Sequence, residues 1–326
     1  MRRIQVHTGA RLHFGLILGN AEDGWQFGGL GLMVRRPGWG MMVSRAASGG
    51  DEICGGVEAT SRIARVLSRL RETLALPSLR VVVSEEIPFH TGLGGGTQLA
   101  LGLASACLWL VEGERRITAE QLAQRVGRSE RSAIGTYGFD HGGFLLDQGQ
   151  TVPETRVQRA LVPEGWRFVL VRPVEGQGMS GAEEQTWFGA RPVMDSALIR
   201  ELSQLALGVV FAGVTELRFA QFAEGLEHYG DLAGRFYSRA QGDIFSSPLI
   251  RDVVRELRAA GVRGAAQSSW GPGICIPAEH AEHVRDICGR LRCFGGAAGL
   301  HVEVSEPLNG GATLWTEATA ERAAIV

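Results

Sequence analysis

Hydrophobic side chains recur along the chain with two periods, about two residues in some segments and three to four in others. Apolar residues at helical spacing over 57–75 predict an amphipathic helix, and the alternating, β-branched segment 79–84 predicts a strand. Residues 3–8 and 29–35 predict two strands around a glycine-rich turn at 24–31. Further helices are predicted at about 97–111, 118–127, 194–225, 228–241 and 248–260.

A turn at 162–166, VPEGW, separates predicted strands at 157–162 and 167–173. We place a domain boundary there, with one domain over 1–164 and a second over 165–326. The irregular mixture of strands and helices indicates an α+β fold rather than a doubly wound parallel sheet. The remaining predicted elements are a strand at 144–149, a strand–loop–helix at 262–290 and a closing strand at 301–307.

Composition fits a globular chain of one large or two moderate domains, with 326 residues, a net charge of −2 and 44% hydrophobic residues. The near-neutral balance gives no support to a nucleic-acid or membrane partner. No apolar run reaches membrane-spanning length and the N-terminus lacks a signal-peptide core, so we expect a cytoplasmic protein. The five cysteines form no CxxC pair and are interpreted as reduced thiols.

All 33 basic residues are arginine, and the chain contains no lysine. Schiff-base catalysis, lysine-bound pyridoxal phosphate and a Walker-type phosphate lysine are therefore excluded. Any anion must be held by arginine, backbone amides, histidine or a metal ion.

A glycine-rich loop joins an apolar strand to an apolar helix in IPFHTGLGGGTQLALGLA, residues 87–104. Exposed amides and the helix dipole make such a junction an anion site, although a tight turn without a ligand would have the same composition. The lysine of a P-loop is missing, and Thr97 stands where the dinucleotide-binding fingerprint needs its third glycine.

The segment PFHTGLGGGTQ, residues 88–98, resembles the Pro-x-x-x-Gly-Leu-Gly-Ser-Ser-Ala motif of the GHMP kinase superfamily. Gly95 and Gly96 replace the serine pair that helps to hold Mg-ATP in those kinases, which argues against ATP phosphoryl transfer. The matching positions are Pro88, Gly92, Leu93 and Gly94.

From residue 7 to about 308, the chain is similar to one branch of that superfamily, the β-ribofuranosylaminobenzene 5′-phosphate synthases of tetrahydromethanopterin biosynthesis. Leu18 stands where archaeal members carry an acidic residue, and the chain is more similar to the bacterial form of one-carbon metabolism. The segments that carry this resemblance are ARLHFGLI (10–17), QFGGLGLM (26–33), GLGGGTQLAL (92–101), RSAIGTYGFDHGGFLLDQG (131–149) and QSSWGPG (267–273).

The resemblance implies a two-domain GHMP fold, with an N-terminal domain like ribosomal protein S5 and a ferredoxin-like C-terminal domain, in a homodimer. It also implies that phosphoribosyl pyrophosphate is joined to 4-aminobenzoate or 4-hydroxybenzoate. A ring carbon displaces pyrophosphate from the anomeric carbon, and carbon dioxide leaves from the same ring position. We expect Mg²⁺ to neutralise the departing pyrophosphate, with no role for pyridoxal phosphate.

Strand alternation places Arg11, His13 and Gly15 on one face, where the first two are candidate catalytic residues. Asp140 is the candidate acid, base or cation-stabilising group by resemblance, and His141 a candidate partner for the para group. Both could instead be structural, with Asp140 in an Asx-turn and His141 hydrogen-bonded. The candidate phosphate- and substrate-binding residues are Gly92, Gly94, Gly95, Gly96, Thr97, Gln98, Arg131, Gln267, Ser268, Ser269 and Trp270.

Structural roles are open for these binding candidates too: an arginine can form a surface ion pair, and Trp270 can stack on an aromatic substrate or pack in the core. Two other functions also stay open. A small-molecule GHMP kinase would use Mg-ATP, against which the missing serine pair speaks. A phosphate-ligand sensor on the same fold would show no turnover.

Overall fold

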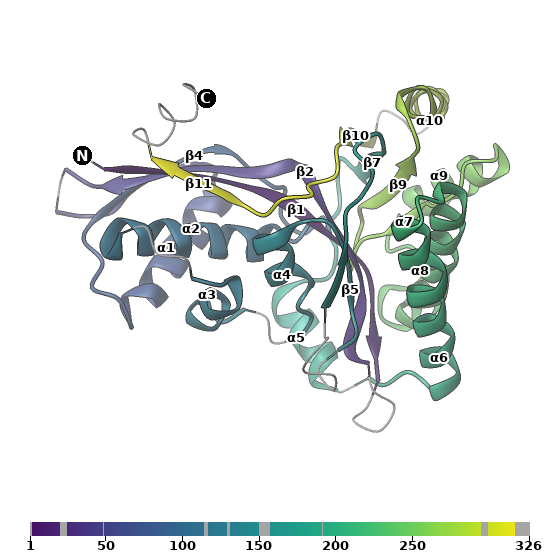
Figure 1. The fold of residues 1–326 in the computed structure, drawn as a ribbon, viewed down its shortest axis with the longest axis horizontal. Coiled ribbons are helices and arrows are strands. Elements are labelled where there is room, and N and C mark those ends of the chain that lie inside the picture. Colours follow the sequence, from purple (N-terminus) through teal and green to yellow (C-terminus); the bar gives the residue numbers. More distant parts are fainter. Residues whose placement is uncertain are drawn as a thin grey trace.

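Two β-sheets organise the chain, and helices pack against them (Figure 1). The computed structural model describes residues 2–19, 25–47, 49–113, 117–128, 131–149, 157–190, 192–294 and 299–316. The strands of the first sheet are β1 Arg3–Leu18, β2 Gln26–Arg45, β3 Glu52–Cys54, β4 Leu79–Glu85, β5 Phe144–Asp147, β6 Val157–Ala160 and β11 Thr313–Thr316. Those of the second are β7 Arg167–Pro173, β8 Ala266–Gln267, β9 Ile274–Ala278 and β10 Leu300–Ser305.

The first sheet runs in the order β11-β1-β2-β4-β3, with β5 paired to β2 and β6, and the second in the order β10-β7-β9-β8. The helices are α1 Val57–Arg71, α2 Gly95–Glu112, α3 Ala119–Val126, α4 Ile134–His141, α5 Gly181–Gly189, α6 Ser196–Leu205, α7 Ala212–Thr215, α8 Phe219–Gln241, α9 Pro248–Ala259 and α10 Ala281–Cys293. A π-helix, η1 Ala206–Phe211, joins α6 to α7.

Strands β1 and β2 form a long antiparallel ribbon, longer than the strands that the sequence predicts at 3–8 and 29–35. The turn predicted at 24–31 is wrong for residues 26–31, which belong to β2. Their glycines serve close packing instead of a turn, since a Cβ on Gly29 would lie 2.5 Å from the carbonyl oxygen of Gly15 and one on Gly31 2.2 Å from Ile134.

Helices α1 to α4 lie against one side of this ribbon in Figure 1. The buried stripe predicted for 97–111 is confirmed in α2, whose Leu99, Leu103 and Cys107 are at most 1% exposed. The predicted cap of α3 is also confirmed, because the Thr118 side chain accepts a hydrogen bond from the backbone of Gln121.

The long helix predicted over 194–225 is interrupted in the structure. The end of that segment and the separate helix predicted at 228–241 form one helix, α8. The break follows from Leu217, whose φ of +58° is left-handed. The stretch Ser196–Thr215 is long and apolar enough to cross a membrane by composition alone. Its Leu202 and Val210 are fully buried in the protein core.

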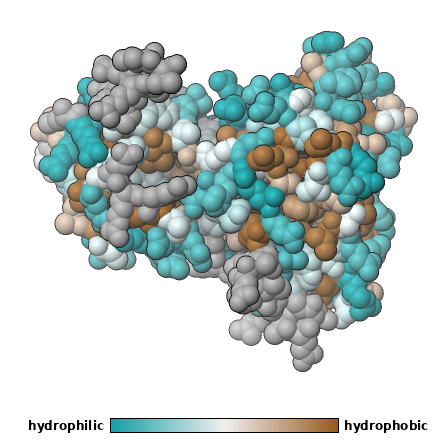
Figure 2. Space-filling model, in the orientation of Figure 1, coloured by the Kyte–Doolittle hydropathy of each residue, from teal (hydrophilic) through white to brown (hydrophobic). Residues whose placement is uncertain are grey.

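The predicted closing strand corresponds to β10, but it does not end the sheets, because β11 follows and pairs with β1 of the first sheet. The chain passes from the first sheet to the second between β6 and β7, and the division at residues 164 and 165 stays a prediction. One hydrophobic core contains residues of both halves. Figure 2 shows exposed hydrophobic residues in the middle of one face, between more polar flanks.

Candidate active site

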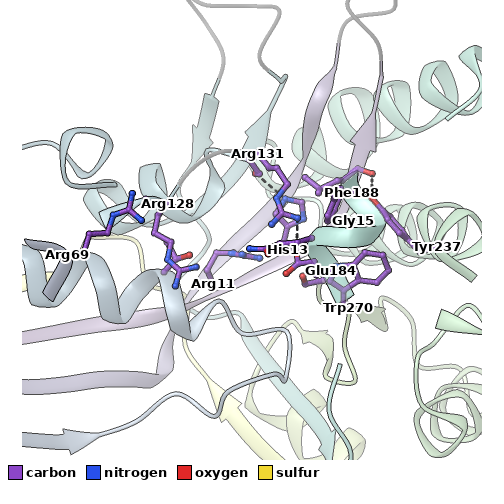
Figure 3. Close-up of a pocket in the computed structure, with 16 residues that line it drawn as sticks. Arg11, His13, Gly15, Arg69, Arg128, Arg131, Glu184, Phe188, Tyr237 and Trp270 are labelled. Atoms are coloured by element: carbon purple, nitrogen blue, oxygen red, sulfur yellow. Dashed lines mark hydrogen bonds and ion pairs between the residues drawn. The ribbon is translucent and has the colours of Figure 1, made fainter. Parts of the chain in front are cut away.

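A cavity of about 410 Å³ opens where β1, the start of α2, the segment before α4, α5 and α8 meet. In Figure 3 the lining residues separate into two groups, with Arg69, Arg128 and Arg11 along one part of the cavity and Phe188, Tyr237 and Trp270 along the other. His13 and Arg131 lie between these two parts (Figure 3). We call the two parts the arginine end and the aromatic end of the cavity.

The arginine end is formed by Arg11, Arg69 and Arg128 together with Thr97 and Gly127. Gly127 ends α3 with a φ of +63°, and a Cβ there would lie 2.4 Å from Nη1 of Arg69. Burial lowers the pKa of Arg11 to about 10, with nearby Glu184 opposing the shift and Arg131 adding to it. Even so, Arg11 remains a cation at neutral pH, so this end of the cavity attracts anions.

The glycine loop lies beside the arginines, and its glycines have separate roles. Gly94 caps α2 at a φ of +67° and packs on Arg11, with only 3.0 Å left between an added Cβ and the Arg11 side chain. A Cβ added to Gly95 would lie 3.1 Å from Ile87 of the core, whereas one added to Gly96 would lie 3.5 Å from Arg62 and 3.6 Å from Arg128. Of the predicted loop residues, Thr97 lines the cavity.

Two further loop candidates serve packing in the structure. A Cβ on Gly92 would lie 2.1 Å from the carbonyl oxygen of Ser268, so the glycine permits the contact between two loops. Gln98 is fully buried and donates a hydrogen bond from Nε2 to the carbonyl of Gly135, 2.8 Å away. Neither lines the cavity.

His13 belongs to a hydrogen-bonded relay with Ser132 and Asp147. Nε2 of His13 lies 3.1 Å from Oγ of Ser132, which donates to Oδ2 of Asp147, also at 3.1 Å. Since the Ser132 proton is directed to the carboxylate, Ser132 accepts from His13, which places the proton of neutral His13 on Nε2 and leaves Nδ1 as an acceptor. Burial, with the charge of Arg11, holds the pKa of His13 well below its usual value. His13 is therefore neutral at pH 7.

Asp147 is a site residue that sequence reasoning did not propose. It ends β5, is fully buried, and also accepts hydrogen bonds from the backbone of Ala133 and Gly149. The available signal was an acidic residue within the apolar segment FLLD, because a buried carboxylate needs several donors.

The aromatic end joins the cavity to the core. The ring of Trp270 is 7% exposed and packs edge-on against Trp187 and Tyr237, with centroids 4.9 and 5.1 Å apart. Trp270 thus packs in the core and borders the cavity at once. On α5, Phe188 lies 4.2 Å below the guanidinium of Arg131, which pairs with Glu184 at 3.0 Å.

The loop that carries Gln267, Ser268 and Ser269 divides its residues between structure and site. Ser268 is fully buried, accepts from the backbone of His13 and donates to the carbonyl of Gly92. Gln267 forms hydrogen bonds with neighbouring backbone and with a glutamine side chain. Neither Gln267 nor Ser268 lines the cavity. Ser269 does line it.

Asp140 and His141 lie at the end of α4 and do not line the cavity. Oδ2 of Asp140 accepts a hydrogen bond of 2.7 Å from the backbone of Ala119, at the start of α3. The ring of His141 packs on Tyr137, with centroids 4.4 Å apart. Helix α4 thus directs Asp140 toward α3 and leaves His141 against its own Tyr137, and the structure does not bring either side chain together with Arg11 and His13.

The described residues include no cluster of three or more His, Cys, Asp or Glu side chains that could hold a metal ion. Glu184 is the single carboxylate among the described residues that line the cavity. The donor set is thus suited to anions rather than to a magnesium ion held by the protein itself.

Residues 61–147 match the model of the GHMP kinases N-terminal domain. The chain also resembles homoserine kinase of Cytophaga hutchinsonii, with a TM-score of 0.63 and 16% identity over 96% of this chain and 97% of the kinase. Mevalonate diphosphate decarboxylase of Staphylococcus aureus gives a TM-score of 0.63 at 12% identity, over 96% of this chain and 98% of the decarboxylase. The fold is therefore that of the GHMP kinases, an α+β fold, as the sequence predicts.

Within that class, the similarity becomes specific. The β-ribofuranosylphenol 5′-phosphate synthase of Methanothermobacter thermautotrophicus is 28% identical, over 89% of this chain and 95% of the relative. The protein of the same name from Methanocaldococcus jannaschii is 23% identical, over 95% and 99%. The chain is thus homologous to these synthases along most of its length, which confirms the resemblance found in the sequence.

Proposed function

We propose that the protein transfers the phosphoribosyl group of phosphoribosyl pyrophosphate to the carboxylated ring carbon of a para-substituted benzoate, with release of carbon dioxide and pyrophosphate. The observation that carries this proposal is one cavity with an arginine end, an aromatic end and a neutral histidine between them. The name of the homologues adds support for 4-hydroxybenzoate as the acceptor, because a ribosylated phenol would be its decarboxylated product.

The donor is assigned to the arginine end. It carries a 5′-phosphate and a pyrophosphate, which guanidinium groups bind through paired hydrogen bonds. Arg11, Arg69 and Arg128 offer three such groups beside the N-terminus of α2, whose dipole also favours negative charge. When the bond from the anomeric carbon to pyrophosphate breaks, its electron pair leaves with the pyrophosphate, and these cations stabilise the added charge.

The acceptor ring is assigned to the aromatic end, against Phe188 and Trp270. The ring carbon that bears the carboxylate forms the new bond to the anomeric carbon, assisted by electrons from the para group. The bond to the carboxylate then breaks, and its electron pair restores the aromatic ring as carbon dioxide leaves. His13, neutral and with Nδ1 unprotonated, lies where donor and acceptor meet and is suited to accept a hydrogen bond or proton from the bound substrates.

Magnesium stays part of the proposal as a partner of the donor. Because the described residues offer no carboxylate cluster, the ion would reach the cavity on the pyrophosphate, and the arginines would hold that complex through its free oxygens. A homodimer is likewise proposed from the resemblance, and a cytoplasmic location from the sequence.

A test against the kinase alternative uses the protein with Mg²⁺, phosphoribosyl pyrophosphate and either acid, with and without ATP. We expect pyrophosphate release that requires the acid and is indifferent to ATP. ADP formation from ATP with no pyrophosphate would instead support a GHMP kinase, a function against which Gly95 and Gly96 argue at the positions of the serine pair. Binding of the donor without turnover of either kind would favour a sensor.

A further inference from the structure

We infer that, before the substrate binds, the Glu184 carboxylate holds the position on Arg131 that the acceptor's carboxylate takes during turnover. Arg131 then exchanges one carboxylate for the other. This inference rests on the proposed function, since it assumes an aromatic acid as acceptor. It makes Glu184 a residue that sets the balance between binding of the acid and release of the decarboxylated product.

The position of Arg131 is the first support. Its guanidinium lies 4.2 Å above the Phe188 ring, at the aromatic end, and beside His13 in Figure 3. An aromatic acid that packs its ring near Phe188 would therefore bring its carboxylate within reach of Arg131. Arginine is the side chain best suited to bind a carboxylate through paired hydrogen bonds.

The Arg131–Glu184 pair is the second support. Nη1 of Arg131 lies 3.0 Å from Oε1 of Glu184, and both residues line the cavity. Their side chains are 31% and 27% exposed, so water competes with the pair. A partly exposed ion pair adds little net stability, and one carboxylate can replace another on Arg131 at small cost.

The attachment of α5 is the third support. None of the nine residues of α5 is buried. Trp187, packed on Trp270, still anchors the helix, so that Glu184 can move off Arg131 while α5 stays in place.

The exchange has a direction during turnover. An incoming acid must displace Glu184, which weakens its binding, whereas the product has lost its carboxylate and cannot compete. After carbon dioxide leaves, Glu184 returns to Arg131, which favours release of the product. Loss of Glu184 should therefore tighten binding of acids specifically and leave neutral rings unaffected.

The experiment compares the wild type with Glu184→Gln, using the fluorescence of the aromatic-end tryptophans to titrate 4-hydroxybenzoate and, separately, phenol. Glu183→Gln is the matched control, because Glu183 is the exposed neighbour on α5 and carries the same charge. We expect Glu184→Gln to bind the acid about two- to fivefold more tightly. Phenol binding should be unchanged in all three proteins, and the control should bind the acid as the wild type does.

Equal acid affinities in the wild type and Glu184→Gln would overturn the inference while leaving the proposed function intact, provided that turnover occurs. A gain shared by acid and phenol, or by both variants, would also overturn it, because the effect would then be loosening of α5 or loss of general charge. If neither protein binds the acid, the aromatic acceptor itself is wrong, and the inference falls with it.

Discussion

Replacement of Asp147 by asparagine tests the relay that orients His13. The carboxylate is fully buried and accepts hydrogen bonds from Ser132 Oγ at 3.1 Å and from the backbone of Ala133 and Gly149 at 2.7 and 3.0 Å. Asparagine has one acceptor oxygen, so its amide group must face at least one of these donors. An orphaned buried donor costs about 1–3 kcal/mol, and two bonds that lose a charged acceptor each lose about 1 kcal/mol. We expect the free energy of unfolding to fall by about 3–5 kcal/mol.

Urea denaturation followed by circular dichroism measures this loss. Asp195→Asn is a suitable control, because Asp195 caps α6 by accepting a hydrogen bond of 2.8 Å from the backbone of Leu198. Asparagine caps a helix about as well as aspartate, so the control should lose less than about 0.5 kcal/mol. Equal losses in the two variants would refute the assignment of a charge-dependent role to Asp147.

The same change should impair turnover, since His13 loses the partner chain that fixes its proton on Nε2. We expect kcat to fall by at least about tenfold with a smaller change in KM, as for a group that acts in the chemical step. Ser132→Ala breaks the same chain while keeping the carboxylate, and should lower kcat similarly. Normal kcat in a folded Ser132→Ala protein would mean that the relay is structural only.

Three further changes give separate readouts. Gly96→Leu should raise the KM for phosphoribosyl pyrophosphate about tenfold by filling space beside Arg62 and Arg128, whereas Gly96→Ala should not. The same KM in both variants would contradict the anion role of this end. Asp140→Asn should lower stability but keep kcat within about threefold, because Asp140 lies outside the cavity, and a large fall in kcat would contradict that. The wild type should lose stability when the pH is lowered from about 7.5 to about 5.5, and His13→Gln should lose less, as measured by urea denaturation.

The sign of that pH effect follows from the lowered pKa of His13. Between the folded pKa and the usual value of 6.5, the unfolded chain binds a proton that the native protein excludes. Acid therefore favours unfolding over this range, and the stability contributed by neutral His13 is fully present only above the unfolded pKa. An identical pH dependence in both proteins would mean that His13 is not held neutral by the fold.

Local patterns were enough to predict the parts of the site that depend on a single element. Strand alternation placed Arg11 and His13 on one face of β1, and both line the cavity. The sequence also predicts the glycine loop at the start of α2, but it does not distinguish Gly95, which faces the core, from Gly96, which faces Arg62 and Arg128. That difference depends on the direction of each missing Cβ, which only the three-dimensional fold defines.

The parts that were missed depend on contacts between distant segments. Helix α5 has no buried residue and so no hydrophobic period that could have predicted it, yet it supplies Glu184 and Phe188 to the cavity. Asp140 was favoured by its glycine-rich surroundings, but α4 directs it toward the backbone of Ala119. Asp147 lies inside the strand predicted at 144–149, and no local pattern there indicates that Ser132 and His13 fold beside it.

The fate of the acceptor's carboxylate tests the central claim most directly. The protein is incubated with Mg²⁺, phosphoribosyl pyrophosphate and 4-hydroxybenzoate or 4-aminobenzoate labelled at the carboxyl carbon, and labelled carbon dioxide and pyrophosphate are both measured. The account predicts that the two are released in equal amounts, without ATP, for at least one of the acids. Release of pyrophosphate with the label retained in the product would contradict it, because the sugar would then be joined through nitrogen or oxygen and not through the ring carbon.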